Sequence, residues 1–339
     1  MVKRTVEKRI LLGHGSGGRL MHSLIKDLLI SKLSNPILAE LSDSAYLDYK
    51  EKLAFTTDSF VVSPLFFPGG DIGKLAVCGT VNDLVMQGAL PQYLSLALIV
   101  EEGLDYKILE RIRDSISVNA KKTGVSIVTG DFKVVEKGAA DKIFINTSGI
   151  GRIITRDKLS LKNLKAGDKI IITGSIGEHG LAVLTKRKSL DLGLNISSDC
   201  AALNGLIIPV LGKTNAIKFM RDPTRGGLAT TLNEIAEGSG LGIVINEKNI
   251  PVSSKVRAAG ELLGIDPLYI ANEGKAVIIA KKEEAGKILA LLKKHPLGSG
   301  AEVIGEVTSN YRRKVILNTA FGTQRIIDML TSEPLPRIC

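Results

Sequence analysis

Residues 68–100 read PGGDIGKLAVCGTVNDLVMQGALPQYLSLALIV, a glycine-rich turn followed by a helical pattern and then by a strand pattern. Apolar side chains recur at helical spacing from Ile72 to about Gln87, and Gly88 can end that helix. The run from Tyr93 to Val100 is almost wholly apolar, which is typical of a buried strand. This stretch therefore predicts a domain in which helices and buried strands are mixed.

The same kinds of pattern extend on both sides of this stretch. Residues 11–34 begin with a glycine cluster and continue as an amphipathic helix. Asp105 can cap a second helix, which Gly124 ends. The strands predicted around these helices lie at residues 45–49, 52–57, 125–129 and 142–150.

The second half of the chain also interleaves helices and strands. Strands are predicted at residues 169–173, 242–245, 275–280 and 302–309, and helices at 179–188, 198–211, 224–237, 253–263 and 283–294. The fold class that follows is α+β or mixed α/β, with an N-terminal mixed α/β domain and a C-terminal α/β domain.

Four segments are predicted along the chain. A glycine-rich N-terminal arm and helix occupy residues 1–42, an N-terminal domain residues 43–155, and a C-terminal domain residues 160–330. Residues 331–339 form a flexible tail, in which two prolines favour extended geometry. A tail of this length reaches about 25–30 Å from its root.

Composition and charge limit the classes of function. The chain has 339 residues, of which 44% are apolar and 24% charged, as in a globular protein. The net charge is +10, but the basic residues are dispersed, aromatic residues make up only 4%, and there is no Trp. Nucleic-acid binding is therefore not expected. The positive charge could serve a binding surface for a ligand or partner. The alternative is that it belongs to Lys side chains on a solvated surface with no binding role.

The three cysteines contain no CxxC pair, so neither a disulfide scaffold nor a structural zinc site is indicated. No stretch of the sequence is apolar enough for a signal peptide or a membrane span. We therefore expect a cytoplasmic protein with no membrane partner.

Six aspartates stand in turns or at helix boundaries beside small residues. Carboxylate oxygens in such open surroundings are ligands that Mg²⁺ accepts while it bridges phosphates. Asp83 is notable because it lies inside an apolar helical run, where an unpaired carboxylate is costly. The alternative is that these residues are ordinary caps and turn formers: Asp43, Asp58, Asp71, Asp83, Asp131 and Asp222.

Two glycine-rich motifs suggest phosphate binding. Residues 13–18 satisfy G-x-G-x-x-G, but no acidic residue ends a second strand at the spacing of a dinucleotide fold, and no P-loop is present. A glycine cluster that opens a helix can still hold phosphate with backbone N–H groups, and the alternative is a flexible arm. In residues 222–228, Asp222 or Thr224 can cap a helix beside Arg225, where an anion could bind. The alternative there is a packing requirement between helices.

Cys339 is the last residue of the proline-spaced tail. Repulsion from its own carboxylate disfavours the thiolate, but an accessible thiol suits a carrier that another enzyme loads. Lys133 and Glu273 each stand next to a predicted strand and are either surface charges or site residues. None of the four histidines pairs at metal-ligand spacing, so zinc or Ser-His-Asp chemistry is not indicated.

Taken together, these motifs resemble the HypE family of the aminoimidazole ribonucleotide synthetase and selenophosphate synthetase superfamily. The resemblance covers essentially the whole chain, and its most specific part is the ending Pro336-Arg337-Ile338-Cys339. The other matching stretches are residues 12–18, 69–84, 129–135, 222–227 and 272–275.

The resemblance implies two domains, ATP and Mg²⁺ in the cleft between them, and a homodimer in which the N-terminal sheets join into a barrel. It implies that HypF carbamoylates Cys339. The chain that carries Cys339 would then use ATP to dehydrate the thiocarbamate to a thiocyanate. The cyanide would pass to iron on the HypC–HypD complex, for assembly of [NiFe]-hydrogenase.

The resemblance also implies roles for individual residues. Cys339, Lys133 and Glu273 would be catalytic, and Asp43, Asp83 and Asp222 would hold the metal. The nucleotide would be bound by Gly15, Ser16, Gly17, Gly18, Asp58, Asp71, Lys74, Asn82, Asp131, Asp222 and Arg225.

Three alternatives remain open from the sequence. A selenophosphate synthetase would be expected to carry a cysteine near the N-terminal glycines, whereas the first cysteine here, Cys78, lies in a predicted helix. A thiamine-phosphate kinase is a second alternative from the same superfamily. A non-catalytic basic scaffold is the third.

Overall fold

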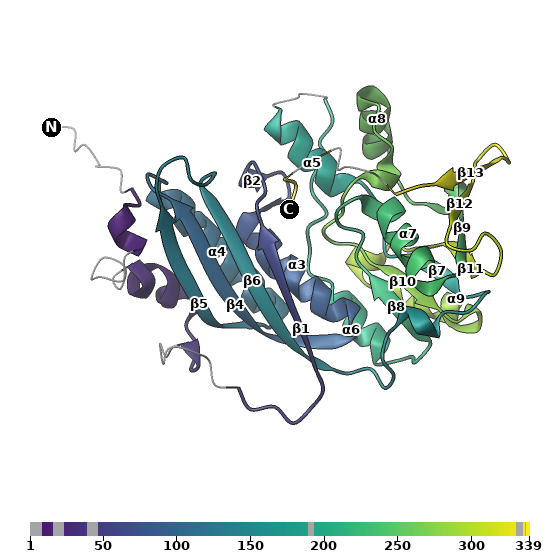
Figure 1. Ribbon diagram of the computed structural model, residues 1–339, viewed down its shortest axis with the longest axis horizontal. Coiled ribbons are helices and arrows are strands. Elements are labelled where there is room, and N and C mark those ends of the chain that lie inside the picture. The colour runs from purple at the N-terminus through teal and green to yellow at the C-terminus, as the bar shows by residue number, and fades with distance from the viewer. Residues whose placement is uncertain (1–8, 16–23, 39–46, 189–192, 330–334, 336) are drawn as a thin grey trace.

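A computed structural model of the chain describes residues 9–15, 24–38, 47–188, 193–329, 335 and 337–339. It has two domains of mixed helix and strand content, each built on one sheet (Figure 1). The first sheet has the strand order β1-β6-β4-β5. Its strands are β1 (Leu53–Phe60), β4 (Ala89–Glu101), β5 (Ser126–Val135) and β6 (Ile143–Ile153).

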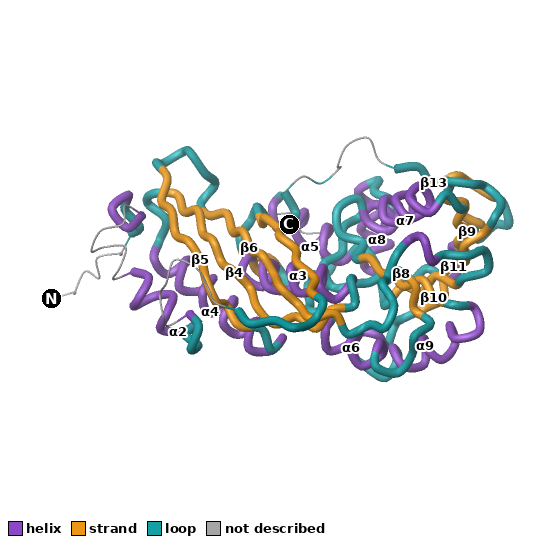
Figure 2. Tube along the Cα trace, turned by 60° about the horizontal axis from the view of Figure 1, so that its bottom comes forward, coloured by secondary structure: helices purple, strands orange, loops and turns teal. Residues whose placement is uncertain are grey.

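Two helices, α3 (Ile72–Met86) and α4 (Tyr106–Thr123), lie on the same face of this sheet (Figures 1 and 2). Helix α4 connects β4 to β5, which pair in parallel, whereas the other pairs of the sheet are antiparallel. The opposite face of the sheet is uncovered in the described chain, and Phe55 on β1 is 70% exposed there.

The boundaries of these helices follow from capping chemistry. The Asp71 carboxylate accepts hydrogen bonds from the backbone N–H groups of Gly73 and Lys74, which begins α3. Gly124 ends α4 in the left-handed conformation, with φ 74°. Helix α3 is buried almost all round because the sheet covers one side and the second domain the other.

The second sheet has the order β13-β12-β9-β11-β7-β10-β8. Only β12 and β9 pair in parallel. The strands are β7 (Lys169–Ile172), β8 (Ile217–Arg221), β9 (Gly242–Asn246), β10 (Val277–Ala280), β11 (Glu302–Thr308), β12 (Val315–Asn318) and β13 (Gln324–Ile327). The helices are α5 (Glu178–Arg187), α6 (Asn204–Leu211), α7 (Gly227–Ser239), α8 (Ser254–Leu263) and α9 (Ala285–Leu292).

Short elements complete the described chain. Near the N-terminus there is a 3₁₀ turn at Leu12–Gly15, followed by a π-helical segment, Ile25–Ile30, that continues into α2 (Ser31–Leu33). A small hairpin of β2 (Phe66–Phe67) and β3 (Gly70–Asp71) precedes α3.

Most predicted elements are confirmed, but several boundaries were wrong. The strand expected at 45–49 is absent over 47–49, and residues 45 and 46 lie outside the described residues. The helix expected at 198–211 begins only at Asn204. The helix expected at 224–237 begins at Gly227 and has no side-chain cap, so neither Asp222 nor Thr224 caps it.

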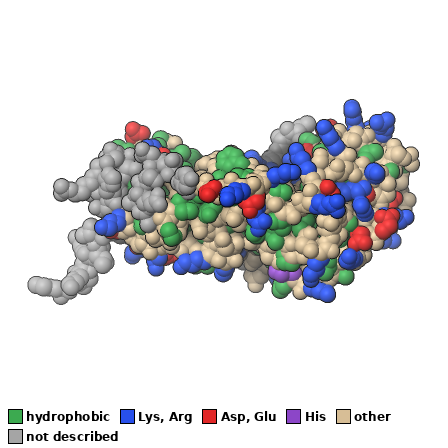
Figure 3. Space-filling model, turned by 90° about the horizontal axis from the view of Figure 1, so that it is seen from below, with side chains coloured by type: hydrophobic (Ala, Val, Ile, Leu, Met, Phe, Trp, Pro, Cys, Tyr) green, Lys and Arg blue, Asp and Glu red, His purple; other side chains and the backbone are tan. Residues whose placement is uncertain are grey.

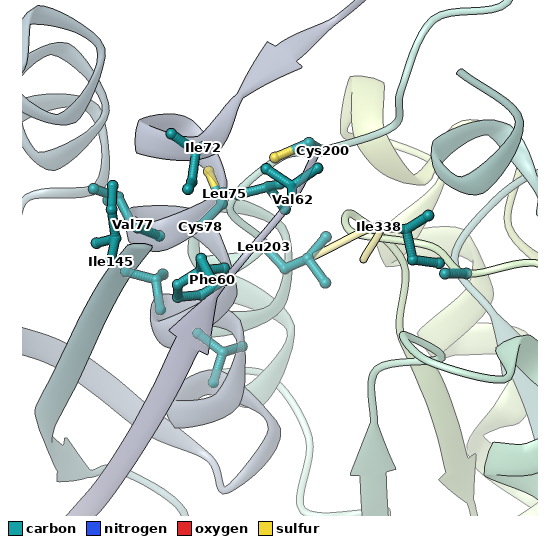
Figure 4. Close-up of a cluster of buried hydrophobic side chains, with 14 of the residues drawn as sticks. Phe60, Val62, Ile72, Leu75, Val77, Cys78, Ile145, Cys200, Leu203 and Ile338 are labelled. Carbon is teal, nitrogen blue, oxygen red and sulfur yellow. The ribbon is translucent and has the colours of Figure 1, made fainter. Parts of the chain in front are cut away.

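The two domains share one hydrophobic core. Phe60 and Val62, at the end of β1 and just after it, belong to the same buried cluster as Cys78 of α3 and as Cys200 and Leu203, which precede α6 (Figure 4). A cluster that joins residues of both domains opposes their separation. The segment at 194–203 therefore runs along the interface between the domains.

Within the described chain, no helix combines the length and the apolarity that crossing a membrane requires.

Candidate active site

A cavity of about 520 Å³ lies between the two domains. Its walls come from β1, from the C-terminal part of α3, and from β8 with the loop that follows it. Polar side chains contributed by both domains, among them Thr56, Asp83, Arg221 and Asp222, line it. A polar cavity formed by two domains is a usual place for a ligand site.

Four carboxylates gather beside this cavity. Asp58 lies on β1, Asp83 on α3, Asp222 directly after β8, and Glu273 shortly before β10. The hydroxyl of Thr56 donates a hydrogen bond of 2.8 Å to Asp83 Oδ2. The elements that carry these residues are brought together by the packing of α3 against both β1 and β8.

The pKa values of these acids reflect their crowding. Burial raises the pKa of Asp222 to about 7, and the nearby Asp83 contributes in the same direction. Burial also raises the pKa of Asp83, and Asp58 raises it further. The pKa of Glu273 lies well above its ordinary value because of burial, with additional contributions from Asp222 and Asp199. Acids that repel each other in a cavity are typical of a functional site.

Basic side chains flank the acids. Arg221 and Arg225 both lower the pKa of Asp83, so their guanidinium groups lie near enough to act on it. Arg225 stands in the loop before α7, where the left-handed Gly226 and Gly227, with φ of 72° and 63°, turn the chain into the helix. Positive groups beside carboxylates suit a phosphate group that is bound together with a cation.

The donor set can be tested against a magnesium ion. Among the described residues, no three His, Cys, Asp or Glu side chains are close enough together to enclose a metal ion. Mg²⁺ does not need such an enclosure, because it binds through one or two carboxylates and takes its other ligands from phosphate and water. The repelling pair Asp83 and Asp222 therefore fits magnesium bound together with a phosphorylated ligand.

Several predicted site residues lie away from this cluster. Asp71 is 12 residues from Asp83 along α3, about 18 Å by helical rise, and it accepts a hydrogen bond from Ser115 Oγ in addition to capping α3. Lys74 Nζ, near the same end of α3, donates to the carbonyl of Gly69. Gly15 ends the N-terminal 3₁₀ turn.

Asp131 and Lys133 form an exposed ion pair of 3.7 Å on β5. Strands β6 and β4 lie between β5 and β1, so the ion pair is about 14 Å from β1 at ordinary strand spacing. Ser16, Gly17, Gly18 and Asp43 lie outside the described residues.

Asn82 is close to the acids, but its amide is occupied by the protein. Its Nδ2 donates to the carbonyls of Ala201 and Glu273, at 3.1 and 3.4 Å, and its Oδ1 accepts from the N–H of Leu203 at 2.8 Å. The amide thus joins α3 to two segments of the second domain.

The last residues of the chain are docked beside the end of β1. The N–H of Val61 donates to the carbonyl of Cys339 at 3.1 Å, and the Ile338 side chain is only 3% exposed. Val61 is three positions after Asp58, about 10 Å along extended chain. Cys339, which is half-buried, therefore lies at one side of the acidic cluster.

Two further groups hold this tail. His179 on α5 is buried, which lowers its pKa and favours the neutral ring. Its Nε2 donates to the carbonyl of Ile338 at 2.6 Å, so Nδ1 accepts from the Ser198 hydroxyl at 2.8 Å. The Arg337 guanidinium forms a 2.9 Å ion pair with Asp141 and also donates to the carbonyl of Val61.

Sequence reasoning missed two of the groups around the site, because no local pattern marks them. Asp199 lies in a segment predicted as helix, and its partners are more than 70 residues away along the chain. His179 was visible as a residue, but its contact with the tail spans 159 positions. Neither contact follows a short spacing that sequence reasoning could detect.

Comparison with known proteins gives consistent matches. Models of AIR synthase related proteins match here over residues 41–153, for the N-terminal domain, and 165–318, for the C-terminal domain. The chain is 47% identical to the carbamoyl dehydratase HypE of Cupriavidus necator, over 98% of this chain and 95% of that protein.

Two solved structures are also similar. A crystal structure of hydrogenase maturation protein HypE in complex with ATP has 49% identity and a TM-score of 0.94, over 97% of this chain and 99% of that one. A chain in a crystal structure of a HypE–HypF complex has 48% identity and a TM-score of 0.80, over 91% of this chain and 100% of that one.

Proposed function

Because this chain belongs to the HypE family of carbamoyl dehydratases, within the AIR synthase related proteins, we propose that it dehydrates a carbamoyl group carried on its own Cys339. It is an enzyme of hydrogenase maturation. The observation that carries the residue assignment is the docking of Cys339 beside the strand of Asp58, at the edge of a cluster of acids that are buried or partly buried.

The reaction needs ATP because the oxygen of a thiocarbamate is a poor leaving group. The carbamoyl oxygen attacks the terminal phosphorus of ATP, ADP leaves, and one N–H proton is lost. The C–O bond then breaks, phosphate departs with that oxygen, and loss of the second N–H proton leaves S–C≡N on the cysteine. The tail loses the elements of water, which appear in ADP and phosphate.

Glu273 is the group that we propose as a proton acceptor in these steps. Glu273 is 3% exposed, and burial together with the nearby Asp222 raises the pKa of its carboxyl group. A largely buried carboxyl beside other acids is costly unless a proton, a cation or a ligand completes its surroundings. A raised pKa also suits proton transfer near neutral pH.

The remaining acids and the arginine would handle the phosphates. Asp83 and Asp222 would hold Mg²⁺, with Asp58 and Arg225 on the nucleotide side, and Asp43 as a further predicted ligand. Bound magnesium neutralises charge on phosphate during phosphoryl transfer. The predicted nucleotide contacts of Gly15 to Gly18 remain part of this proposal.

We propose that the protein acts as a homodimer. The uncovered face of the first sheet presents Leu53, Phe55 and Ile99, each at least 40% exposed, which is an apolar surface that a second copy could bury. Asp131 and Lys133 lie on the same side of that sheet as Ile99, by strand register. These two residues are far from the acidic cluster of their own chain. We therefore propose that they perform their predicted roles in the site of the partner subunit.

The other partners are those that the resemblance to the HypE family implies, and a solved HypE–HypF complex supports the first of them. We propose HypF as the enzyme that loads Cys339, the HypC–HypD complex as the acceptor of cyanide, and the cytoplasm as the location. No nucleic-acid partner is proposed, because on the face shown in Figure 3 the Lys and Arg side chains are scattered rather than gathered in one stripe.

Intact mass spectrometry after incubation with HypF, carbamoyl phosphate and ATP tests this function. We expect a carbamoyl adduct on Cys339 that then loses one water. Cys339→Ala should keep ATP binding but form no adduct. An unmodified tail, or an adduct on Cys78 instead, would refute the assignment, and absence of ATP-dependent phosphate release would favour the scaffold alternative.

A further inference from the structure

The backbone of Glu273 is held at both of its polar atoms. Its N–H donates to Asp199 Oδ1 at 3.2 Å. Its carbonyl accepts from the N–H of Ala201 at 3.3 Å and from Asn82 Nδ2 at 3.4 Å. With both polar groups of the backbone fixed, the position of the Glu273 carboxyl depends only on its own side-chain rotations.

Asp199 does more than accept one hydrogen bond. Its Oδ2 accepts from the N–H of Gly274 at 3.1 Å and from Lys275 Nζ at 3.0 Å, so one carboxylate binds three consecutive residues. The side chains of Asp199 and Lys275 are 4% and 13% exposed. A buried charged pair of this kind holds geometry strongly, because removing one partner leaves the other uncompensated.

The segment that carries Asp199 packs closely against the segment from Glu273 to Lys275. A Cβ atom on Gly274 would lie 2.0 Å from the carbonyl oxygen of Asp199, which no side chain could tolerate without backbone movement. The same segment is tied to α3, because Asn82 bonds to Ala201 and Leu203 as well as to Glu273. Asn82 immediately precedes Asp83 in the sequence, so these contacts fix Glu273 relative to the helix that carries a proposed metal ligand.

We infer that Asp199 is a positioning residue for the dehydration step, which holds the Glu273 backbone so that its carboxyl faces the tail thiocarbamate in the cleft. This inference rests on the proposed function. Asp199 touches no reacting atom in this scheme and acts only through Glu273. Loss of its carboxylate should slow proton removal without weakening the binding of ATP.

A double-mutant cycle with Glu273→Gln tests the inference. The dehydration of carbamoylated Cys339 is followed by intact mass spectrometry at saturating ATP, and the KM for ATP is measured from phosphate release. We expect Asp199→Ala to lower kcat about 10- to 100-fold, as for a positioned proton-transfer group, and to change KM less than about threefold. In the Glu273→Gln background the same change should lower the residual rate less than about twofold.

Asp168→Ala is the matched control. Asp168 is also a buried aspartate in an ion pair with a lysine, Lys218 at 2.6 Å, and it also accepts a backbone N–H, from Lys165. Asp168 lies at the N-terminal end of β7, away from the segment that carries Glu273. Its loss should therefore reduce thermal stability but not kcat. Asp199→Asn, which keeps the shape and one acceptor oxygen, decides the question if Asp199→Ala does not fold, and its kcat should lie between those of the wild type and Glu273→Gln.

Three results would overturn the inference. One is an unchanged kcat in Asp199→Ala or Asp199→Asn. Another is an equal loss of rate in the wild-type and Glu273→Gln backgrounds, which would make the effect independent of Glu273. The last is full activity of Glu273→Gln. A wild-type protein that shows no ATP-dependent water loss would instead refute the proposed function, and the inference with it.

Discussion

Truncation of Ile338 should release the tail without unfolding the enzyme. Ile338 is 3% exposed in the docked tail, directly before Cys339. Ile338→Ala removes three carbon atoms from this buried position, worth about 2–3 kcal/mol at about 0.8 kcal/mol for each carbon. We expect the tail to leave its site while both domains stay folded, so this loss should weaken docking rather than global stability. The ratio of docked to undocked tail should fall about 30- to 150-fold.

The assay is alkylation of Cys339 by a small thiol reagent, read by intact mass spectrometry under native conditions. While the docked state predominates, the alkylation rate follows the undocked fraction and should rise by the same factor. Cys78 and Cys200 are buried in the shared core and should stay unmodified, which shows that the domains remain folded.

Ile326→Ala provides the control substitution. Ile326 lies on β13 and is 51% exposed, so the same three carbon atoms are removed from a site that contributes little burial. Its alkylation rate should equal that of the wild type. Equal rates in Ile338→Ala and the wild type would refute the reasoning, because they would mean that burial of Ile338 does not hold the tail.

Three further predictions follow from the site. His179→Gln removes the ring that donates to the carbonyl of Ile338. Disrupting a buried hydrogen bond costs about 1–3 kcal/mol, so docking should weaken and the rate of Cys339 alkylation should rise at least about fivefold. An unchanged alkylation rate would contradict this. Burial raises the pKa of Asp222 from 3.8 to about 7, so the folded state binds more protons than the unfolded state between these values and the free energy of unfolding falls as pH rises through them. Asp222→Asn should therefore gain thermal stability relative to the wild type at pH 7.5 more than at pH 5, in the absence of Mg²⁺ and nucleotide; an equal difference at both pH values would contradict this. Gly274→Ala should lower both thermal stability and kcat, because its Cβ would meet the Asp199 carbonyl at 2.0 Å; a melting temperature like that of the wild type would contradict this.

Helical periodicity and capping residues were sufficient to predict α3 and α4. Both helices carry a long apolar pattern, begin at an aspartate cap and end near a glycine. Strands β8, β12 and β13 were missed, and their length alone does not explain this, because β7 and β10 have only four residues each and were predicted. Their place in the sheet is decided by partners from distant segments, such as the pairing of β8 with β10.

The site could be predicted as a set of residue types but not as an arrangement. Asp58, Asp83 and Asp222 were singled out because carboxylates in turns or in an apolar helix need a reason, and Glu273 because it precedes a predicted strand; the structure brings these four together. Asp71 had the same local signal, yet its carboxylate caps α3 at the far end of that helix. The local sequence around an aspartate does not distinguish a cap from a ligand, because the difference lies in tertiary packing.

The tail also shows that local sequence does not determine tertiary contacts. Two prolines in a stretch with no helix or strand pattern predicted a flexible segment, whereas the described end of the tail is held by Ile338, His179 and Arg337. The composition of a segment reports its own propensity, but docking depends on the surface that receives it. Here that surface is built by β1 and α5, which lie far from the tail in sequence.

The shared core also decides which part of the molecule must move during catalysis. Phe60, Cys78 and Leu203 join the two domains in one buried cluster, so opening the cleft between them would expose apolar surface at about 25 cal/mol for each Å². Release of the tail exposes far less, because the burial at its described end consists mainly of Leu335 and Ile338. Movement of the tail is therefore the cheaper route by which Cys339 can meet another enzyme and return to the acids. On this argument the domains stay closed while the thiol alternates between two positions, and tighter docking of the tail would favour dehydration while slowing its carbamoylation.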